Sequence, residues 1–112
     1  MEYISLQNSD LNVSRICMGG CPMGQYGWGQ VDEKKLIRAV EQALEEGVNF
    51  FDTADTYGLG TSEKTLAKAL GSKRQEAVIA DKFGVRVENG HTFYDNSPEW
   101  IEQALEGSLK RL

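Results

Sequence analysis

The chain has 112 residues, of which 40% are hydrophobic and 26% are charged, and this composition excludes a disordered or collagen-like protein. The length predicts a single domain. The formal net charge of −5 argues against nucleic acid as a partner, because a phosphate backbone attracts basic surfaces.

The sequence contains no apolar run of about 18 residues, so we expect no membrane-spanning helix and no membrane partner. Its first residues lack the basic and apolar regions of a signal peptide. We therefore expect a cytoplasmic protein in which Cys17 and Cys21 are reduced thiols, with a disulfide between them as the alternative. Two cysteines and the single histidine, His91, are too few ligands for a zinc site, so we expect no metal.

Apolar periodicity predicts a small N-terminal hairpin followed by three units, each made of a short apolar strand and an amphipathic helix. The expected hairpin strands are residues 3–6 and 11–13, the three later strands are residues 15–18, 48–51 and 77–80, and the helices begin near Asp32, Ser62 and Ser97. Residues 19–30 and 85–96 are predicted as loops. Continuous apolar strands that alternate with helices are typical of a parallel sheet covered by helices, which predicts an α/β fold.

Three chemically active side chains follow two of these strands. Asp52 and Tyr57 come after residues 48–51, and Lys82 comes after residues 77–80. The carboxyl ends of parallel strands meet at one edge of a sheet, where α/β proteins collect their functional residues. We therefore expect a carboxylate, a phenol and an amine to converge there.

This trio can deliver a proton. A phenol titrates near 10 and is a weak acid at neutral pH, but a neighbouring ammonium group makes it a stronger one. We therefore predict that Lys82 activates Tyr57, and that Asp52 holds Lys82 charged and in place. Tyr57 would then protonate a carbonyl oxygen as a hydride reaches the carbon. Taken singly, each residue is more often structural (a turn cap, a loop aromatic, a solvated charge), so the prediction depends on their combination.

The residues around the trio resemble the signature of the aldo-keto reductase family. Residues 47–58, GVNFFDTADTYG, followed by Ser62-Glu63 and by ALG at residues 69–71, are similar to the family pattern G-x-N-x-x-D-T-A-x-x-Y-G…S-E…A-L-G. Residues 81–84, DKFG, resemble the family's lysine-bearing strand end. The resemblance implies a TIM (β/α)8 barrel, of which residues 1–112 would be the N-terminal portion of a single barrel domain, with a hairpin and about three βα units.

The resemblance makes Asp52, Tyr57 and Lys82 three members of the family's catalytic tetrad. The fourth member is a histidine at the end of the fourth barrel strand, which would lie beyond residue 112. His91 follows the third predicted strand, so we expect it to be an ordinary loop residue.

The resemblance also implies a cofactor site and a substrate pocket. Gly20, Cys21 and Gln30 would contact a nicotinamide cofactor together with Asp52. Relatives often have Thr-Trp in place of Gly20-Cys21, so backbone contacts are the ones expected there. Trp28 would line the substrate pocket with Tyr57, or would only pack within its own loop.

We therefore predict an NADPH-linked oxidoreductase that reduces aldehydes or ketones to alcohols, with NADH as the alternative cofactor and a small carbonyl compound as substrate. This chain would carry the proton donor and would be inactive alone, because three βα units cannot close a barrel. Its open strand edges would need the missing part of the barrel, or another copy of the chain, to cover them. The alternatives are a non-catalytic nicotinamide-binding or partner subunit on the same barrel, and a generic TIM-barrel lyase or isomerase.

Overall fold

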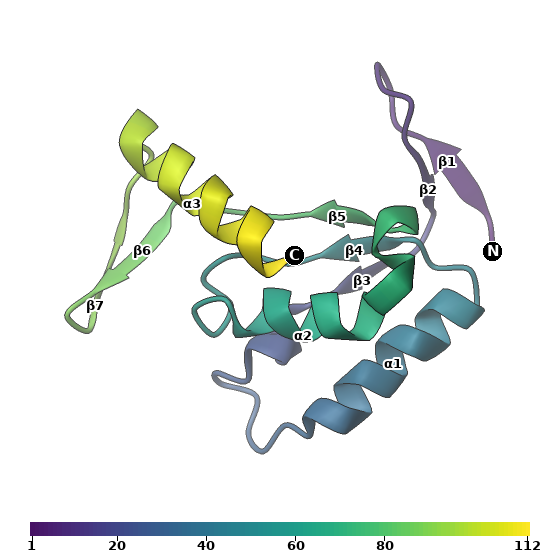
Figure 1. Cartoon of the computed structure of the whole chain (residues 1–112), viewed down its shortest axis with the longest axis horizontal. Coiled ribbons are helices and arrows are strands. Elements are labelled where there is room, and N and C mark those ends of the chain that lie inside the picture. The colour runs from purple at the N-terminus through teal and green to yellow at the C-terminus, as the bar shows by residue number, and fades with distance from the viewer.

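A three-stranded parallel sheet forms the centre of the structure, a computed structural model that describes all 112 residues (Figure 1). Its strands are β3 (Cys17–Gly19), β4 (Phe50–Asp52) and β5 (Val78–Ala80), hydrogen-bonded in that order. Each strand leads into a helix, directly or through a loop or hairpin. The predicted order of three βα units is therefore confirmed.

Helices α1 (Glu33–Glu45) and α2 (Thr61–Leu70) lie on the same side of this sheet, and α3 (Pro98–Arg111) follows the third strand (Figure 1). Asp32 caps α1 by accepting a hydrogen bond from the Lys34 N–H at 2.9 Å, as the sequence predicts. The longest helix of the three has 14 residues, and none is long and apolar enough to cross a membrane.

The hydrophobic core lies between the sheet and the first two helices. Phe51 of β4 is fully buried there, with Val40 of α1 and Leu66 of α2. The other buried members of the core are Met23, Val48, Ala69, Leu70 and Ala77. Because successive side chains of a strand point to opposite faces, burial of Phe51 directs its neighbour Asp52 away from the helices.

Strands β1 (Tyr3–Ser5) and β2 (Asn12–Ser14) form the predicted N-terminal hairpin, which projects from one end of the sheet (Figure 1). Asn49 joins this hairpin to the strand that carries Asp52. Its side-chain oxygen accepts from the Ser14 N–H at 2.7 Å, and its Nδ2 donates to the Asn12 carbonyl at 3.0 Å. The polar Asn49 interrupts an apolar run because its side chain fixes the hairpin backbone to the start of β4.

The structure corrects one expectation about the loops. Residues predicted as a loop contain a second hairpin, made of β6 (Val85–Glu88) and β7 (His91–Tyr94), which extends away from the sheet (Figure 1). Asn89 and Gly90 both have positive φ, at 50° and 76°, which is the conformation of a type I′ turn. The Asn-Gly pair between alternating residues was a readable hairpin signal.

Arg86 fastens this second hairpin to the start of α3. Its guanidinium group lies 4.4 Å from the centre of the Trp100 ring and 5.6 Å from that of Phe93. Arg86 also donates to Asp95 at 2.9 Å, and Asp95 in turn accepts from the Ser97 N–H that begins the helix. The orientation of the hairpin is therefore set by charge and stacking as much as by its backbone.

A buried ion pair holds α2 against α3. The Glu63 side chain is fully buried, and both of its oxygens accept hydrogen bonds from Arg111, at 3.3 Å for the Nη2 donor. A first-turn acid that only faces the helix dipole would be solvated, so Glu63 has a larger role. A Cβ at Gly60 would lie 2.7 Å from Arg111 Cδ, so glycine there leaves room for the arginine.

Replacing Arg111 with methionine is predicted to lower the free energy of unfolding by about 3–5 kcal/mol, because it leaves the buried Glu63 carboxylate without a partner. Urea unfolding of the purified protein measures this loss. Lys110→Met is the matched control, since Lys110 makes only an exposed ion pair with Glu106 at 3.7 Å. The control should cost less than about 1 kcal/mol. Equal losses in the two variants would contradict the assignment.

Candidate active site

Asp52 and Lys82 meet at the carboxyl ends of neighbouring strands, as predicted. The register pairs Asp52 with Ala80, and the ladder continues beyond the strands through the Asp55 N–H, which donates to the Lys82 carbonyl at 3.0 Å. Lys82 Nζ then donates to Asp52 Oδ2 at 2.7 Å. The two side chains are 46% and 38% exposed, so a bound molecule can reach them.

The charge of Lys82 is favoured by this arrangement. Burial opposes the charge, but the hydrogen bond and negative charge of Asp52, with a contribution from Tyr57, outweigh burial and raise the pKa of Lys82. Lys82 Nζ lies 5.0 Å from the centre of the Tyr57 ring. The structure therefore brings together all three side chains of the predicted trio.

The loop that carries Tyr57 is fixed by a close crossing of two backbones. A Cβ at Gly24 would lie 2.6 Å from the Tyr57 carbonyl carbon and 2.8 Å from the Gly58 nitrogen. The Tyr57 carbonyl accepts from the Ser62 N–H at 3.1 Å. The loop after β3 therefore presses directly on the backbone of Tyr57, and only glycine fits at the crossing.

Gly20 makes a second close approach at the end of β3. Its N–H donates to the Asp52 carbonyl at 2.7 Å, and its carbonyl accepts from the Ser62 hydroxyl at 2.8 Å. A Cβ at Gly20 would lie 2.8 Å from the Asp52 carbonyl oxygen. Ser62 therefore links the loop after β3 to the Tyr57 loop through hydrogen bonds. The sequence predicted that Ser62 opens the helix, but α2 begins one residue earlier, at Thr61 after Gly60.

The other predicted contacts lie along the loop after β3. Cys21 begins a short 3₁₀ turn, and its side chain is exposed and free. Gln30 and Trp28 are also exposed, and both lie outside the lining of the cavity described below. Their cofactor and substrate roles stay predictions. His91 lies on the exposed strand β7, apart from the trio in the fold.

Cys17, which the sequence predicts only as a reduced thiol, lies near the site. Burial, and then the negative charge of Asp52, raise the pKa of the Cys17 thiol, while the charge of Lys82 partly offsets them. Cys17 and Gly19 alternate with Met18, which packs against the core, so they share the face that bears Asp52. A three-residue alternation does not predict by itself which face Cys17 occupies, and the register that pairs Gly19 with Asp52 is needed to place it.

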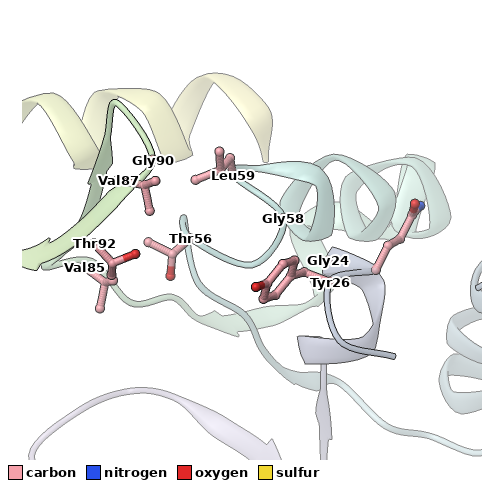
Figure 2. Close-up of a pocket in the computed structure, with 10 residues that line it drawn as sticks. Gly24, Tyr26, Thr56, Gly58, Leu59, Val85, Val87, Gly90 and Thr92 are labelled. Atoms are coloured by element: carbon pink, nitrogen blue, oxygen red, sulfur yellow. The ribbon is translucent and has the colours of Figure 1, made fainter. Parts of the chain in front are cut away.

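A cavity of about 790 Å³ adjoins the Tyr57 loop (Figure 2). Its walls come from residues 24–26, from Thr56, Gly58 and Leu59, and from the β6–β7 hairpin. Thr56 lies between the hairpin and Tyr26, whose side chain is 91% exposed. None of the lining side chains is charged, and Asp52, Tyr57 and Lys82 themselves lie outside the lining.

A parallel sheet whose strands each lead into a helix, with polar side chains gathered at its carboxyl edge, is typical of part of a TIM (β/α)8 barrel. The chain belongs to the aldo/keto reductase family, whose family model matches residues 15–112. The predicted fold class, a partial (β/α)8 barrel, is thereby confirmed.

Named relatives match along the whole chain. Aldo-keto reductase YhdN of Bacillus subtilis is 36% identical over 114 residues, and L-galactose dehydrogenase of Arabidopsis thaliana is 36% identical over 115 residues; each match covers 100% of this chain and 34% of the relative. The structure of aldo-keto reductase AKR11C1 from Bacillus halodurans, in its holo form, superimposes with a TM-score of 0.87 at 37% identity, covering 100% of this chain and 36% of that one. The chain thus spans about a third of the length of these relatives.

Gly24→Ala is predicted to lower the free energy of unfolding by about 1–3 kcal/mol, because its methyl group would overlap the backbone of Tyr57 and Gly58. Gly19→Ala is the control, since a Cβ there meets nothing within 4 Å. Denaturant unfolding compares the two variants. A Gly24→Ala protein as stable as Gly19→Ala would show that the crossing does not constrain the Tyr57 loop.

Proposed function

We propose that the complete protein is an NADPH-linked oxidoreductase that reduces aldehydes or ketones to alcohols, and that this chain supplies the proton. NADH is the alternative hydride donor. The observation that carries the proposal is the Lys82 ammonium, held by Asp52 at 2.7 Å and lying 5.0 Å from the centre of the Tyr57 ring. A half-exposed ion pair adds little to stability, about 0–1 kcal/mol, so a chemical role explains its placement better.

We propose that the open space at the end of β3 receives the nicotinamide ring. A Cβ at Gly19 would meet nothing within 4 Å, and Gly19 pairs with Asp52 in the sheet. Gly20, Cys21 and Gln30 follow along the same loop and, with Asp52, would hold the cofactor. When bound, the nicotinamide supplies the hydride. Membership of the aldo/keto reductase family supports this cofactor class.

Three side chains of this chain would donate the proton and stabilise the charge that its loss leaves behind. Tyr57 would donate its hydroxyl proton to the carbonyl oxygen of the substrate, which becomes the alcohol oxygen, and would be left as a phenolate. The Lys82 ammonium stabilises that phenolate through charge. Asp52 keeps Lys82 charged, in agreement with the raised pKa of the lysine.

The cavity beside Tyr57 supports neutral substrates. Its aromatic and apolar wall, with Thr56 and Thr92 as hydroxyl groups, offers no charge to pair with an acidic or basic substrate. We propose that it receives the part of the carbonyl compound remote from the reacting group, and that Trp28 also contributes to substrate binding.

The remainder of a barrel would cover the surfaces that this chain leaves open. Strands β3 and β5 are the two edges of the sheet, and Leu105 and Leu109 of α3 are exposed. We therefore propose that the chain alone is inactive and that further barrel units, or another copy, pack against these edges. Free thiols at Cys17 and Cys21 favour a reducing compartment such as the cytoplasm.

Tyr57→Phe in the complete gene product is predicted to lower kcat/KM for a small aldehyde by about 10²–10⁴-fold, because it removes the acid and keeps the ring. NADPH oxidation measures turnover, and quenching of protein fluorescence measures cofactor binding, which should be unchanged. Tyr94→Phe, at an exposed tyrosine outside the cavity lining, is the matched control and should leave turnover unchanged. Cofactor binding without turnover in the wild type would favour the non-catalytic partner subunit instead.

Thr92→Lys is predicted to raise kcat/KM for 4-carboxybenzaldehyde relative to benzaldehyde by about three- to tenfold, because it places a cation in a neutral cavity. Tyr94→Lys adds the same charge on β7 but outside the cavity lining, and should leave the ratio unchanged. If both lysines shift the ratio equally, the cavity does not receive the substrate.

A further inference from the structure

Three carboxyl groups gather on the helix side of the sheet, behind the Asp52–Lys82 pair. They belong to Asp55, Glu63 and Asp81, and we call them the carboxyl cluster. Glu63 is fully buried and holds Arg111. Asp55 and Asp81 each have one carboxyl oxygen that is buried and has no hydrogen-bond partner, Oδ1 and Oδ2 respectively.

The charges of the cluster do not balance. Three ionised carboxylates would face one guanidinium group, that of Arg111, in a site partly removed from water. Neighbouring like charges that are partly removed from water favour retention of a proton by one of the carboxyl groups. Two other cations nearby have different partners. Arg74, which lines a cavity with Asp81, donates to the carbonyls of Leu112 and Ala77, and Lys82 donates to Asp52.

Asp81 is the member best placed to keep that proton. Burial, followed by the neighbouring Glu63 carboxylate, raises the pKa of Asp81 to about 6, against the lowering effect of the Lys82 N–H and Ser108. A protonated Asp81 can donate to Glu63, whereas an ionised one can only repel it. A hydrogen bond between Asp81, at the end of β5, and Glu63 of α2 would therefore require a proton.

Two residues of the cluster also bond to the backbone of Lys82, Asp81 through its carboxyl group and Asp55 through its main-chain N–H. Asp81 Oδ1 accepts from the Lys82 N–H at 2.9 Å, and the Asp55 N–H donates to the Lys82 carbonyl at 3.0 Å. We propose that Asp81 is a positioning residue for Lys82: as a neutral acid it donates a hydrogen bond to Glu63 and holds the end of β5, with Lys82, against α2. The proposal rests on the proposed function for its kinetic readout.

Asp81→Asn keeps a hydrogen-bond donor at this position but removes the titratable group, because an amide can donate to Glu63 at every pH. In the complete gene product, kcat for aldehyde reduction by Asp81→Asn divided by that of the wild type is expected to rise about three- to tenfold as pH increases from about 5 to about 8. Asp81→Ala, which cannot donate, should be slower than Asp81→Asn throughout. Asp10→Asn, an exposed acid in the N-terminal turn, should give a flat ratio.

Two results would overturn the proposal: a flat ratio for Asp81→Asn, or equal kcat values for the amide and alanine variants. If the complete protein reduces no carbonyl at all, the proposed function fails, and urea unfolding then tests the proton itself. An acid whose folded pKa is raised loses stability as pH rises, so the wild type should lose stability relative to Asp81→Asn between about pH 4 and pH 6. Parallel pH dependence of the two proteins would refute the proton-dependent hydrogen bond between Asp81 and Glu63.

Discussion

The ion pair between Asp52 and Lys82 depends on the register of two parallel strands. With Asp52 opposite Ala80, the residue two places beyond Ala80 lies within reach of the carboxylate, and Lys82 Nζ closes the gap at 2.7 Å. A shift of β5 by one residue would turn Lys82 to the helix side, where Asp81 now lies, and would move Ile79 away from the core. The same register therefore builds the hydrophobic core on one face and the chemistry on the other.

Close backbone approaches then place Tyr57 beside this pair. Gly20 and Gly24 allow the loop after β3 to touch the backbone of Asp52 and of Tyr57, and any larger residue would push the loops apart. The loop that carries the phenol is thus positioned by main-chain contacts. On the opposite face, Glu63 and Arg111 anchor α2, from which Ser62 reaches Gly20. The core, the helices and the Tyr57 loop therefore form one connected support.

Local signals in the sequence predicted much of this. Asp32 caps α1 and Ser97 caps α3, and strand-end positions correctly brought Asp52 to Lys82. Long-range partners were missed, because Glu63 meets Arg111 across 48 residues and no local pattern links them. The β6–β7 hairpin was missed although Asn89-Gly90 signals its turn, because each strand has only four residues and is largely exposed, so the alternation of Val85 and Val87 with charged residues is a weak signal.

A double-mutant cycle tests most directly whether Tyr57 and Lys82 act on one proton. The kcat/KM of the complete protein for a small aldehyde is compared among the wild type, Tyr57→Phe, Lys82→Met and the double variant. Residues that act as a unit are strongly non-additive, so the double variant should be no slower than the slower single variant. Effects that add in free energy would mean that the two residues serve separate steps, and would contradict the account.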